Sequence, residues 1–305
     1  MPRKLLYAAV LILVVGGVFW FATEPERLDA ATLAGVQPGD PDRGERIFQI
    51  GGCASCHVRP DAEGEAELEL AGGFALETAF GTFVAPNISP DPEHGIGAWE
   101  AADFANAMMR GVSPEGEHYY PAFPYTSYAR MKLQDVADLF AYLKTLPPIA
   151  EDAPSHTLSF PYTLRRGLGL WKLLYLSEEP VVTFPVGAPE AVLRGRYLVE
   201  GPGHCGECHT PRFFTGGLKG DRWLAGARAL EGEGSVPNIT PSEEGLRSWS
   251  PGDIVYYFET GFTPDFDSVG GAMVAVQENL AKLRAEDREA IAAYLKAVPI
   301  RASSE

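Results

Sequence analysis

Two short segments decide the fold: Cys53-Ala54-Ser55-Cys56-His57 and Cys205-Gly206-Glu207-Cys208-His209. Each places two cysteines three positions apart and a histidine directly after the second, and together they use all four cysteines of the 305-residue chain. This C-x-x-C-H pattern is the attachment sequence of c-type haem. The two thiols form thioethers with the haem vinyl groups, and the adjacent imidazole coordinates the iron.

Other uses of the cysteines explain the pattern less well. Two redox-active disulfides would not require a histidine at the same next position twice. A zinc site needs its two cysteine pairs about 15 to 20 residues apart, whereas 148 residues separate Cys56 from Cys205. The sequence therefore predicts two covalently bound haem c groups, with thioethers at Cys53, Cys56, Cys205 and Cys208 and axial ligands at His57 and His209.

The two segments belong to a longer internal repeat. The similarity continues downstream of each motif, at an offset that stays between 150 and 152 residues. Matching positions include residues 86–90 (Pro-Asn-Ile-Ser-Pro) with residues 237–241 (Pro-Asn-Ile-Thr-Pro), and Trp99 with Trp249. A single repeat at a constant offset indicates a duplicated domain rather than a solenoid. We predict one domain over residues 37–150, a linker over 151–187 and a second domain over 188–300.

Both ends of each copy have a helical pattern, which predicts an all-α fold. Asp40-Pro41 provides an N-cap followed by a proline at the first helical position. Before the end of each copy, apolar residues follow i, i+3, i+4, i+7 spacing; they are Val136, Leu139, Phe140 and Leu143, and Ile291, Tyr294, Leu295 and Val298. Long Gly- and Pro-rich loops with little strand alternation lie between, and such loops need something else to fill the core. A haem supplies that filling.

The distal iron ligand indicates whether a haem transfers electrons or catalyses a reaction. A methionine opposite the histidine fills the sixth coordination position and suits electron transfer, whereas an open position lets small molecules bind the iron. In the second domain Met273 is the only methionine after position 131. It lies in a loop ahead of the closing helix. We expect it to be the distal ligand there.

The first domain leaves the distal ligand less defined. The strict counterpart of Met273 is Phe123, which cannot bind iron, and Met131 follows eight residues later. We favour Met131, with His118 as the alternative. Of the remaining candidates, two methionines fit core packing and three histidines fit solvent exposure or local hydrogen bonds: Met108, Met109, His94, His156 and His204.

The N-terminus carries a candidate membrane anchor, predicted over residues 1–23. Arg3 and Lys4 precede 18 uncharged apolar residues, 5–22, which as a helix span about 27 Å, close to the ~30 Å hydrocarbon core. A cleaved signal peptide and a buried core helix are the alternatives. The aromatic end of the run, residues 19–22, favours an uncleaved single-pass anchor. The positive-inside rule then puts the haem domains in the periplasm, on the bacterial inner membrane.

Charge constrains the partners. Acidic residues outnumber basic ones 41 to 25, for a formal net charge of −16, which argues against nucleic-acid binding because phosphates require a surplus of cations. Without Arg3 and Lys4, 23 basic residues remain against the 41 acidic ones. We expect at least one partner to dock by a basic face, at a rate that falls as salt rises.

The chain also resembles a known family. The resemblance is carried by the segments 86–90, 95–99 (Gly-Ile-Gly-Ala-Trp), 110–114 (Arg-Gly-Val-Ser-Pro) and 120–128 (Tyr-Pro-Ala-Phe-Pro-Tyr-Thr-Ser-Tyr). These resemble the membrane-associated multihaem cytochrome c subunits of bacterial periplasmic alcohol, gluconate and aldehyde dehydrogenases, over roughly residues 37–300. The resemblance implies two class I cytochrome c folds in tandem and supports Met131 as an axial ligand. It departs from the family in one respect, since many of those subunits carry three haem motifs.

The expected function is electron transfer rather than catalysis. We expect a membrane-anchored diheme cytochrome c, with no catalytic residues, that carries single electrons from a periplasmic dehydrogenase or other donor to the respiratory chain. A cytochrome c, an oxidase or a quinol-linked complex would accept them. The alternative is a diheme enzyme, either a peroxidase or a thiosulfate-oxidising cytochrome, with one catalytic haem. A fixed subunit of a larger oxidase is the third possibility.

Overall fold

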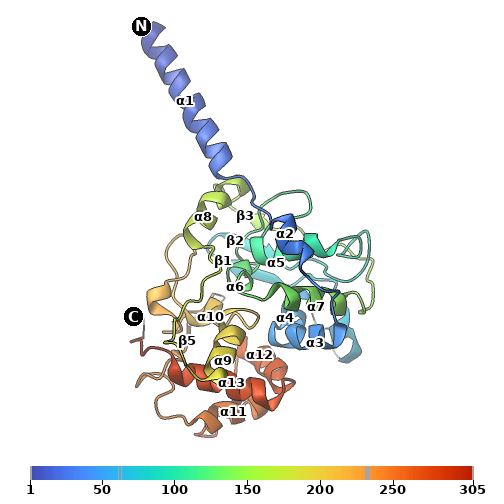
Figure 1. The fold of residues 1–305 in the computed structure, drawn as a ribbon, viewed down its shortest axis with the longest axis vertical. Helices are drawn as coiled ribbons and strands as arrows, with labels where there is room; N and C mark the ends of the chain where they lie inside the picture. The colour runs from blue at the N-terminus through green and yellow to red at the C-terminus, as the bar shows by residue number, and fades with distance from the viewer. Residues whose placement is uncertain (1, 61, 63, 231–233, 304–305) are drawn as a thin grey trace.

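The computed structural model describes residues 2–60, 62, 64–230 and 234–303. A long helix, α1 (Pro2–Ala22), projects alone from a rounded, mainly helical body (Figure 1). Within it, Arg3–Ala22 is long and apolar enough to cross a membrane and is not buried against the protein. The other helices are α2 (Ala30–Ala34), α3 (Pro41–Ile50), α4 (Cys53–His57), α5 (Ala101–Arg110), α6 (Tyr125–Tyr128), α7 (Leu133–Leu143), α8 (Leu168–Tyr175), α9 (Glu190–Glu200), α10 (Gly206–His209), α11 (Pro251–Thr260), α12 (Met273–Ala281) and α13 (Ala285–Ala297).

Two helix pairs organise the body. Helix α3 packs on α7, and α9 packs on α13. The predicted start of the first pair is confirmed, since Pro41 opens α3 and the Asp40 side chain accepts hydrogen bonds from two backbone N–H groups of its first turn. Each pair thus joins the helix before a C-x-x-C-H motif to the last long helix of the same copy.

Glycines allow each pair to approach closely. A Cβ on Gly44 of α3 would overlap the carbonyl oxygen of Asp138 on α7, and a Cβ on Gly195 of α9 would overlap that of Ala290 on α13. Gly44 and Gly195 occupy equivalent positions in the repeat, so both crossings depend on the absence of a side chain at the same place.

The apolar core forms two clusters. The first cluster contains residues from α3, α5 and α7. Met131 belongs to it, and Cys53 packs against it. The other gathers residues from α9, α11 and α13, with Cys205 and Met273 packed against it. Ile50, at the end of α3, belongs to the second cluster, so the two clusters meet.

Short strands supplement the helices. β1 (Ala75–Thr78), β2 (Gly81–Val84) and β3 (Thr157–Leu158) form an antiparallel sheet in that order. β4 (Ala227–Arg228) pairs antiparallel with β5 (Ser235–Val236). β3 and α8 both lie within the segment 151–187 that the sequence predicts as a linker, so this segment is structured and part of it completes a sheet of the first half.

Filling either glycine position should loosen the helix pair. We expect Gly44→Ala and Gly195→Ala each to destabilise the haem-loaded protein by about 1–3 kcal/mol, because the new methyl group overlaps a backbone carbonyl that cannot move alone. Urea unfolding followed by circular dichroism would measure this. The control is Gly252→Ala in α11, whose Cβ would lie 3.6 Å from its nearest neighbour and which should gain up to about 1 kcal/mol from helix propensity. Equal effects at all three positions would contradict the close-crossing explanation.

Candidate functional site

The two motif histidines have the same environment. His57, in α4, has its Nδ1 2.8 Å from the carbonyl oxygen of Pro86, and His209, in α10, has its Nδ1 2.8 Å from that of Pro237. Because a carbonyl only accepts, Nδ1 carries the proton in both rings. Burial lowers the pKa of both histidines, and the carbonyl only partly opposes this. Each ring is therefore held neutral, with its Nε2 lone pair left for a metal.

Two asparagines hold the carbonyls in place. Asn87 accepts a hydrogen bond from the Ser89 N–H through Oδ1 and donates through Nδ2 to the carbonyls of Ile149 and Glu151. Asn238 bonds in the same way to the Thr240 N–H and the carbonyl of Arg301. Both asparagines belong to the internal repeat, but the sequence pattern alone assigns them no role. Their signal was the matched Pro-Asn-Ile segment, which begins 29 positions after His57 and 28 positions after His209.

The cysteines of each motif differ in accessibility. Cys53 and Cys205 are partly buried, whereas Cys56 and Cys208 are exposed. Burial raises the pKa of Cys53 and of Cys205 to about 12, so both stay protonated in an apolar setting that suits an uncharged thioether. Among the described residues, no group of three or more His, Cys, Asp or Glu side chains is placed to hold a metal ion.

The two candidate distal methionines lie in the expected clusters. Met131 is buried in the apolar cluster that borders Cys53, and Met273 opens α12 beside the cluster that borders Cys205. Each half therefore brings together one cysteine pair, one neutral imidazole and one thioether within an apolar setting. This donor set fits haem c with histidine and methionine as axial ligands.

The other candidates have other contacts. His118 is buried, but its Nε2 lies 2.9 Å from the carbonyl oxygen of Thr23 at the end of α1. Met108 and Met109 are buried in α5 as predicted. His94 bonds locally to Asp91, also as predicted.

Two histidine predictions were wrong. His156 accepts a hydrogen bond from the backbone N–H of Val84, which lies 72 positions away. His204 has its Nε2 3.1 Å from the carbonyl oxygen of Gly51 and its ring edge-on to Tyr128. Both contacts are made between segments far apart in the chain, which local sequence does not reveal. His204 thus links the residue just before the second motif to Gly51, two residues before the first motif.

Glu207, inside the second motif, contacts the first half of the chain. It is buried, and its Oε1 accepts hydrogen bonds of 2.9 Å from the hydroxyls of Thr126 and Ser127 in α6. Its Oε2 pairs with Arg212 at 2.7 Å. Burial alone would raise the pKa of the Glu207 carboxyl, but Arg212 and the two hydroxyls outweigh it and hold that pKa below the ordinary value of 4.5.

A reciprocal contact joins the first motif to the second half. Asn279, in α12, donates from Nδ2 to the Ser55 hydroxyl at 3.2 Å. Ser55 and Glu207 both lie between the cysteines of their motifs. Each motif therefore touches the methionine-bearing segment of the opposite half, Thr126 and Ser127 just before Met131 and Asn279 just after Met273.

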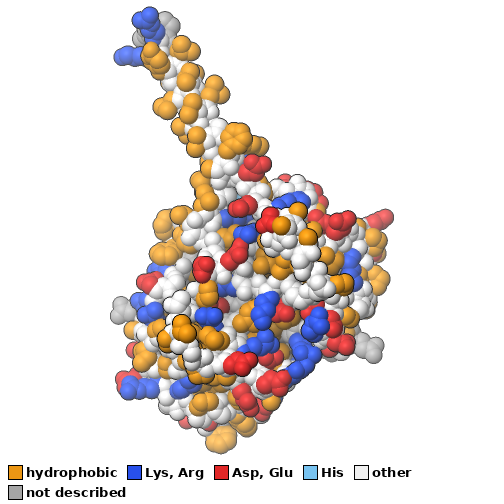
Figure 2. All heavy atoms as spheres, in the orientation of Figure 1, with side chains coloured by type: hydrophobic (Ala, Val, Ile, Leu, Met, Phe, Trp, Pro, Cys, Tyr) orange, Lys and Arg blue, Asp and Glu red, His pale blue; other side chains and the backbone are white. Residues whose placement is uncertain are grey.

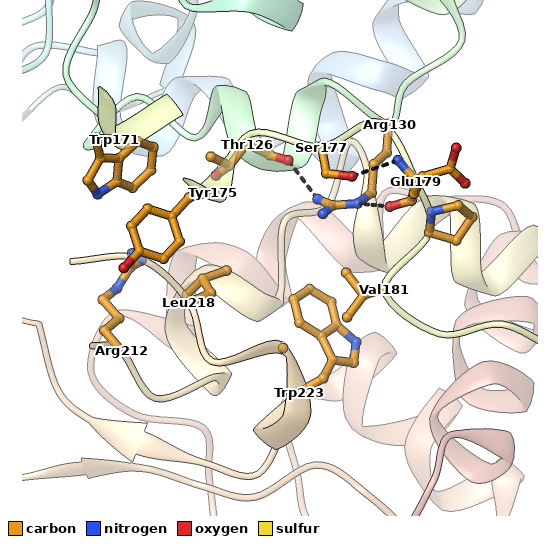
Figure 3. A pocket seen from close by; sticks show the side chains of 12 residues that line it. Thr126, Arg130, Trp171, Tyr175, Ser177, Glu179, Val181, Arg212, Leu218 and Trp223 are labelled. Carbon is orange, nitrogen blue, oxygen red and sulfur yellow. Dashed lines mark hydrogen bonds between the residues drawn. The ribbon is translucent and has the colours of Figure 1, made fainter. Parts of the chain in front are cut away.

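A cavity of about 230 Å³ lies where the two halves and the segment between them meet. Figure 3 shows the rings of Trp171, Tyr175 and Trp223 around it, with Arg130 bonded to the carbonyls of Thr126 and Glu179. Trp171 and Tyr175 come from α8. The middle segment is therefore part of the interface between the halves.

Comparison with known proteins gives consistent matches. Residues 41–147 match the family model described as cytochrome c. The chain is 54% identical to a diheme cytochrome c-type protein of Cereibacter sphaeroides, over 98% of this chain and 99% of that one. It is 35% identical to the fructose dehydrogenase cytochrome subunit of Gluconobacter japonicus and 33% identical to the gluconate 2-dehydrogenase cytochrome c subunit of Pantoea cypripedii. These two matches include 90% and 91% of this chain. The chain spans only 58% of the fructose dehydrogenase subunit and 64% of the gluconate 2-dehydrogenase subunit.

The ion pair of Glu207 should contribute to stability in a pH-dependent way. We expect Glu207→Gln to lower the free energy of unfolding by about 2 kcal/mol at neutral pH, because Arg212 loses its buried partner. The lowered pKa means that the parent keeps this contribution above about pH 4.5 and loses it as pH falls through the folded-state value. The difference between variant and parent should therefore shrink in acid.

Urea unfolding at a series of pH values would measure this difference. The control is Glu243→Gln, which removes an exposed pair with Arg247 and should change stability by about 0–1 kcal/mol. A difference for Glu207→Gln that stays constant from neutral to acid pH would contradict the assignment.

Proposed function

Because the chain belongs to the cytochrome c family, whose members bind haem c covalently, we propose that it carries two such haems and relays single electrons between redox partners. When bound, haem c supplies an iron that takes up and releases one electron reversibly. The residues of this chain attach the group, orient its axial ligands and exclude water from it. The observation that carries the proposal is the repeated histidine–carbonyl bond, with a methionine in the apolar cluster of each half.

Each half of the chain supplies the complete proposed ligand set for one haem. In the first half Cys53 and Cys56 form the thioethers, and His57 and Met131 are the axial ligands. In the second half the same roles belong to Cys205, Cys208, His209 and Met273. The contact of His118 with Thr23 supports Met131 over His118, since the ring nitrogen that would bind iron already meets a carbonyl.

The proposed organisation has an anchor and two haem domains. Residues 1–23 hold the protein in the bacterial inner membrane, and residues 37–150 and 188–300 form the domains on the periplasmic side. The isolated, unburied helix α1 supports the anchor. The two helix pairs and two apolar clusters support tandem domains, joined by residues 151–187, which pack against both.

The proposed donor is a periplasmic dehydrogenase. Relatives of this chain are cytochrome subunits of fructose, alcohol and gluconate dehydrogenases. The acidic balance of the chain favours partners with a basic docking face. A cytochrome c, an oxidase or a quinol-linked complex would accept the electrons, so the protein itself acts as a relay and not as an enzyme.

The number of haems is tested by removing one attachment site at a time. We expect two haems c per chain, and one after Cys53→Ala with Cys56→Ala or after Cys205→Ala with Cys208→Ala, because each thiol pair holds its own haem. Pyridine haemochrome absorbance against protein concentration measures the ratio. A parent chain with a single haem would overturn the diheme proposal.

The distal ligands are tested by truncating each methionine. We expect Met131→Ala and Met273→Ala each to halve the far-red thioether–iron band of the oxidised protein, to lower one midpoint potential and to create one carbon monoxide site in the reduced protein, since each opens one coordination position. Met108→Leu, a buried control in α5, should change none of these. Carbon monoxide binding to the parent itself would instead favour a diheme enzyme with one open haem.

A further inference from the structure

Exposed apolar side chains gather on the segment between the two halves. We call this set the apolar shoulder; its members are Phe160, Tyr162, Leu164, Leu170, Leu173 and Leu174, with exposed fractions between 43% and 79%. Leu170, Leu173 and Leu174 follow i, i+3, i+4 spacing on α8 and share one helix face. Exposed apolar groups are ordinary when scattered, but a contiguous set marks a surface that meets something apolar.

The opposite face of α8 fixes the shoulder to the body. Lys172 is buried, and its Nζ donates to the carbonyls of Arg110 and Gly111 at 2.6 and 2.7 Å. A Cβ on Gly169 would lie 2.6 Å from the Cα of Thr23, so α8 passes very close to the end of α1. The outward direction of the three leucines is thus set by a packed inner face.

Helix α1 leaves the body at this same place. The Arg166 guanidinium, in the turn before α8, lies 4.3 Å from the centre of the Trp20 ring and bonds to the Thr23 hydroxyl at 3.0 Å. Thr23 also meets His118. Figure 1 shows α8 beside the base of α1, and Figure 2 shows hydrophobic side chains along α1 and on the body near its base.

The position of a bilayer around α1 follows from its length. The uncharged residues 5–22 of α1 span about 27 Å, close to the ~30 Å hydrocarbon core, so the aqueous boundary falls near Trp20 to Ala22. The shoulder is held against that boundary. We propose that the apolar shoulder rests in the phospholipid surface as a second membrane contact, and this proposal depends on the proposed anchor.

Charge indicates how the shoulder would bind lipid. Arg165 and Arg166 lie between Leu164 and Leu170 in the chain. The segment after α1 carries four exposed charges, Glu24, Glu26, Arg27 and Asp29. Cations and anions are balanced among these described residues, which therefore form no basic cluster to attract anionic headgroups. Contact with the membrane relies on the apolar side chains, so it should occur on zwitterionic lipid and change little with salt.

Such a contact would fix the orientation of the body. A single spanning helix can tilt in the bilayer, and a body fixed to its end would tilt with it. Two membrane contacts, α1 and the shoulder, would hold the body in one orientation relative to the bilayer. The first half of the chain, which contacts the end of α1 through His118, then stays next to the lipid.

The test places a fluorescent label at single sites of the full-length, haem-loaded chain. The native cysteines are consumed by haem in the proposed structure, so an added cysteine is the one that reacts with bimane, and the parent chain checks for background labelling. Leu173→Cys reports the shoulder and Val14→Cys reports α1. Ile300→Cys is the matched control, since its 66% exposed fraction is close to the 69% of Leu173. Ile300 follows α13, which lies away from α1 (Figure 1).

The chains are reconstituted into phosphatidylcholine vesicles that carry a nitroxide-labelled lipid. We expect a blue shift and strong quenching of bimane at positions 14 and 173, at low and at high salt, and neither effect at position 300. Quenching at position 14 without quenching at position 173 would overturn the shoulder contact and leave the anchor standing, as when a protein partner covers the shoulder. No quenching at either position would overturn both the anchor and the shoulder.

Discussion

The hydrogen bond from each motif histidine to a proline carbonyl is the constraint on which the rest of the structure depends. A free imidazole can rotate and can place its proton on either nitrogen, and either change would remove the proposed iron ligand. The carbonyls of Pro86 and Pro237 prevent both. Asn87 and Asn238 hold those carbonyls by bonding to backbone at the end of the same half. The bond therefore requires that the start and the end of each half pack together. The close helix crossings at Gly44 and Gly195 make this packing possible.

The two halves have a similar arrangement of helices, but the side chains that they place at their interface differ. Ser55 occupies the place in the first motif that the buried Glu207 occupies in the second, and each reaches across to the opposite methionine-bearing segment. The small hydroxyl needs a long partner, Asn279, whereas the long carboxylate reaches the short side chains of Thr126 and Ser127. These unlike pairs let the two halves fit together. A change at the interface thus acts on the neighbourhood of both proposed ligand sets.

The sequence predicts the features that depend on local pattern. The N-cap at Asp40 and the apolar run over residues 5–22 are continuous stretches of sequence, and the helices that they indicate are present. It does not predict the contacts of His204 or Glu207, because their partners are brought near only by the packing of the halves. The sequence predicts a linker over residues 151–187 and does not indicate the strand and helix within it, for the same reason. Its β3 residues have no strand pattern of their own and pair only because β2 offers an edge.

The misregister of the two methionines also has a structural origin. In the second half Met273 opens a nine-residue helix, α12, that leads on towards α13. In the first half the corresponding region contains the one-turn helix α6, and Met131 follows it, two residues before α7. The helical content before the closing helix differs, so a constant sequence offset points to Phe123 while the buried thioether lies eight residues further on. Burial in the cluster that borders Cys53 therefore supports Met131 as the proposed counterpart of Met273, because an iron ligand is selected by where its sulfur can reach and not by its place in the chain.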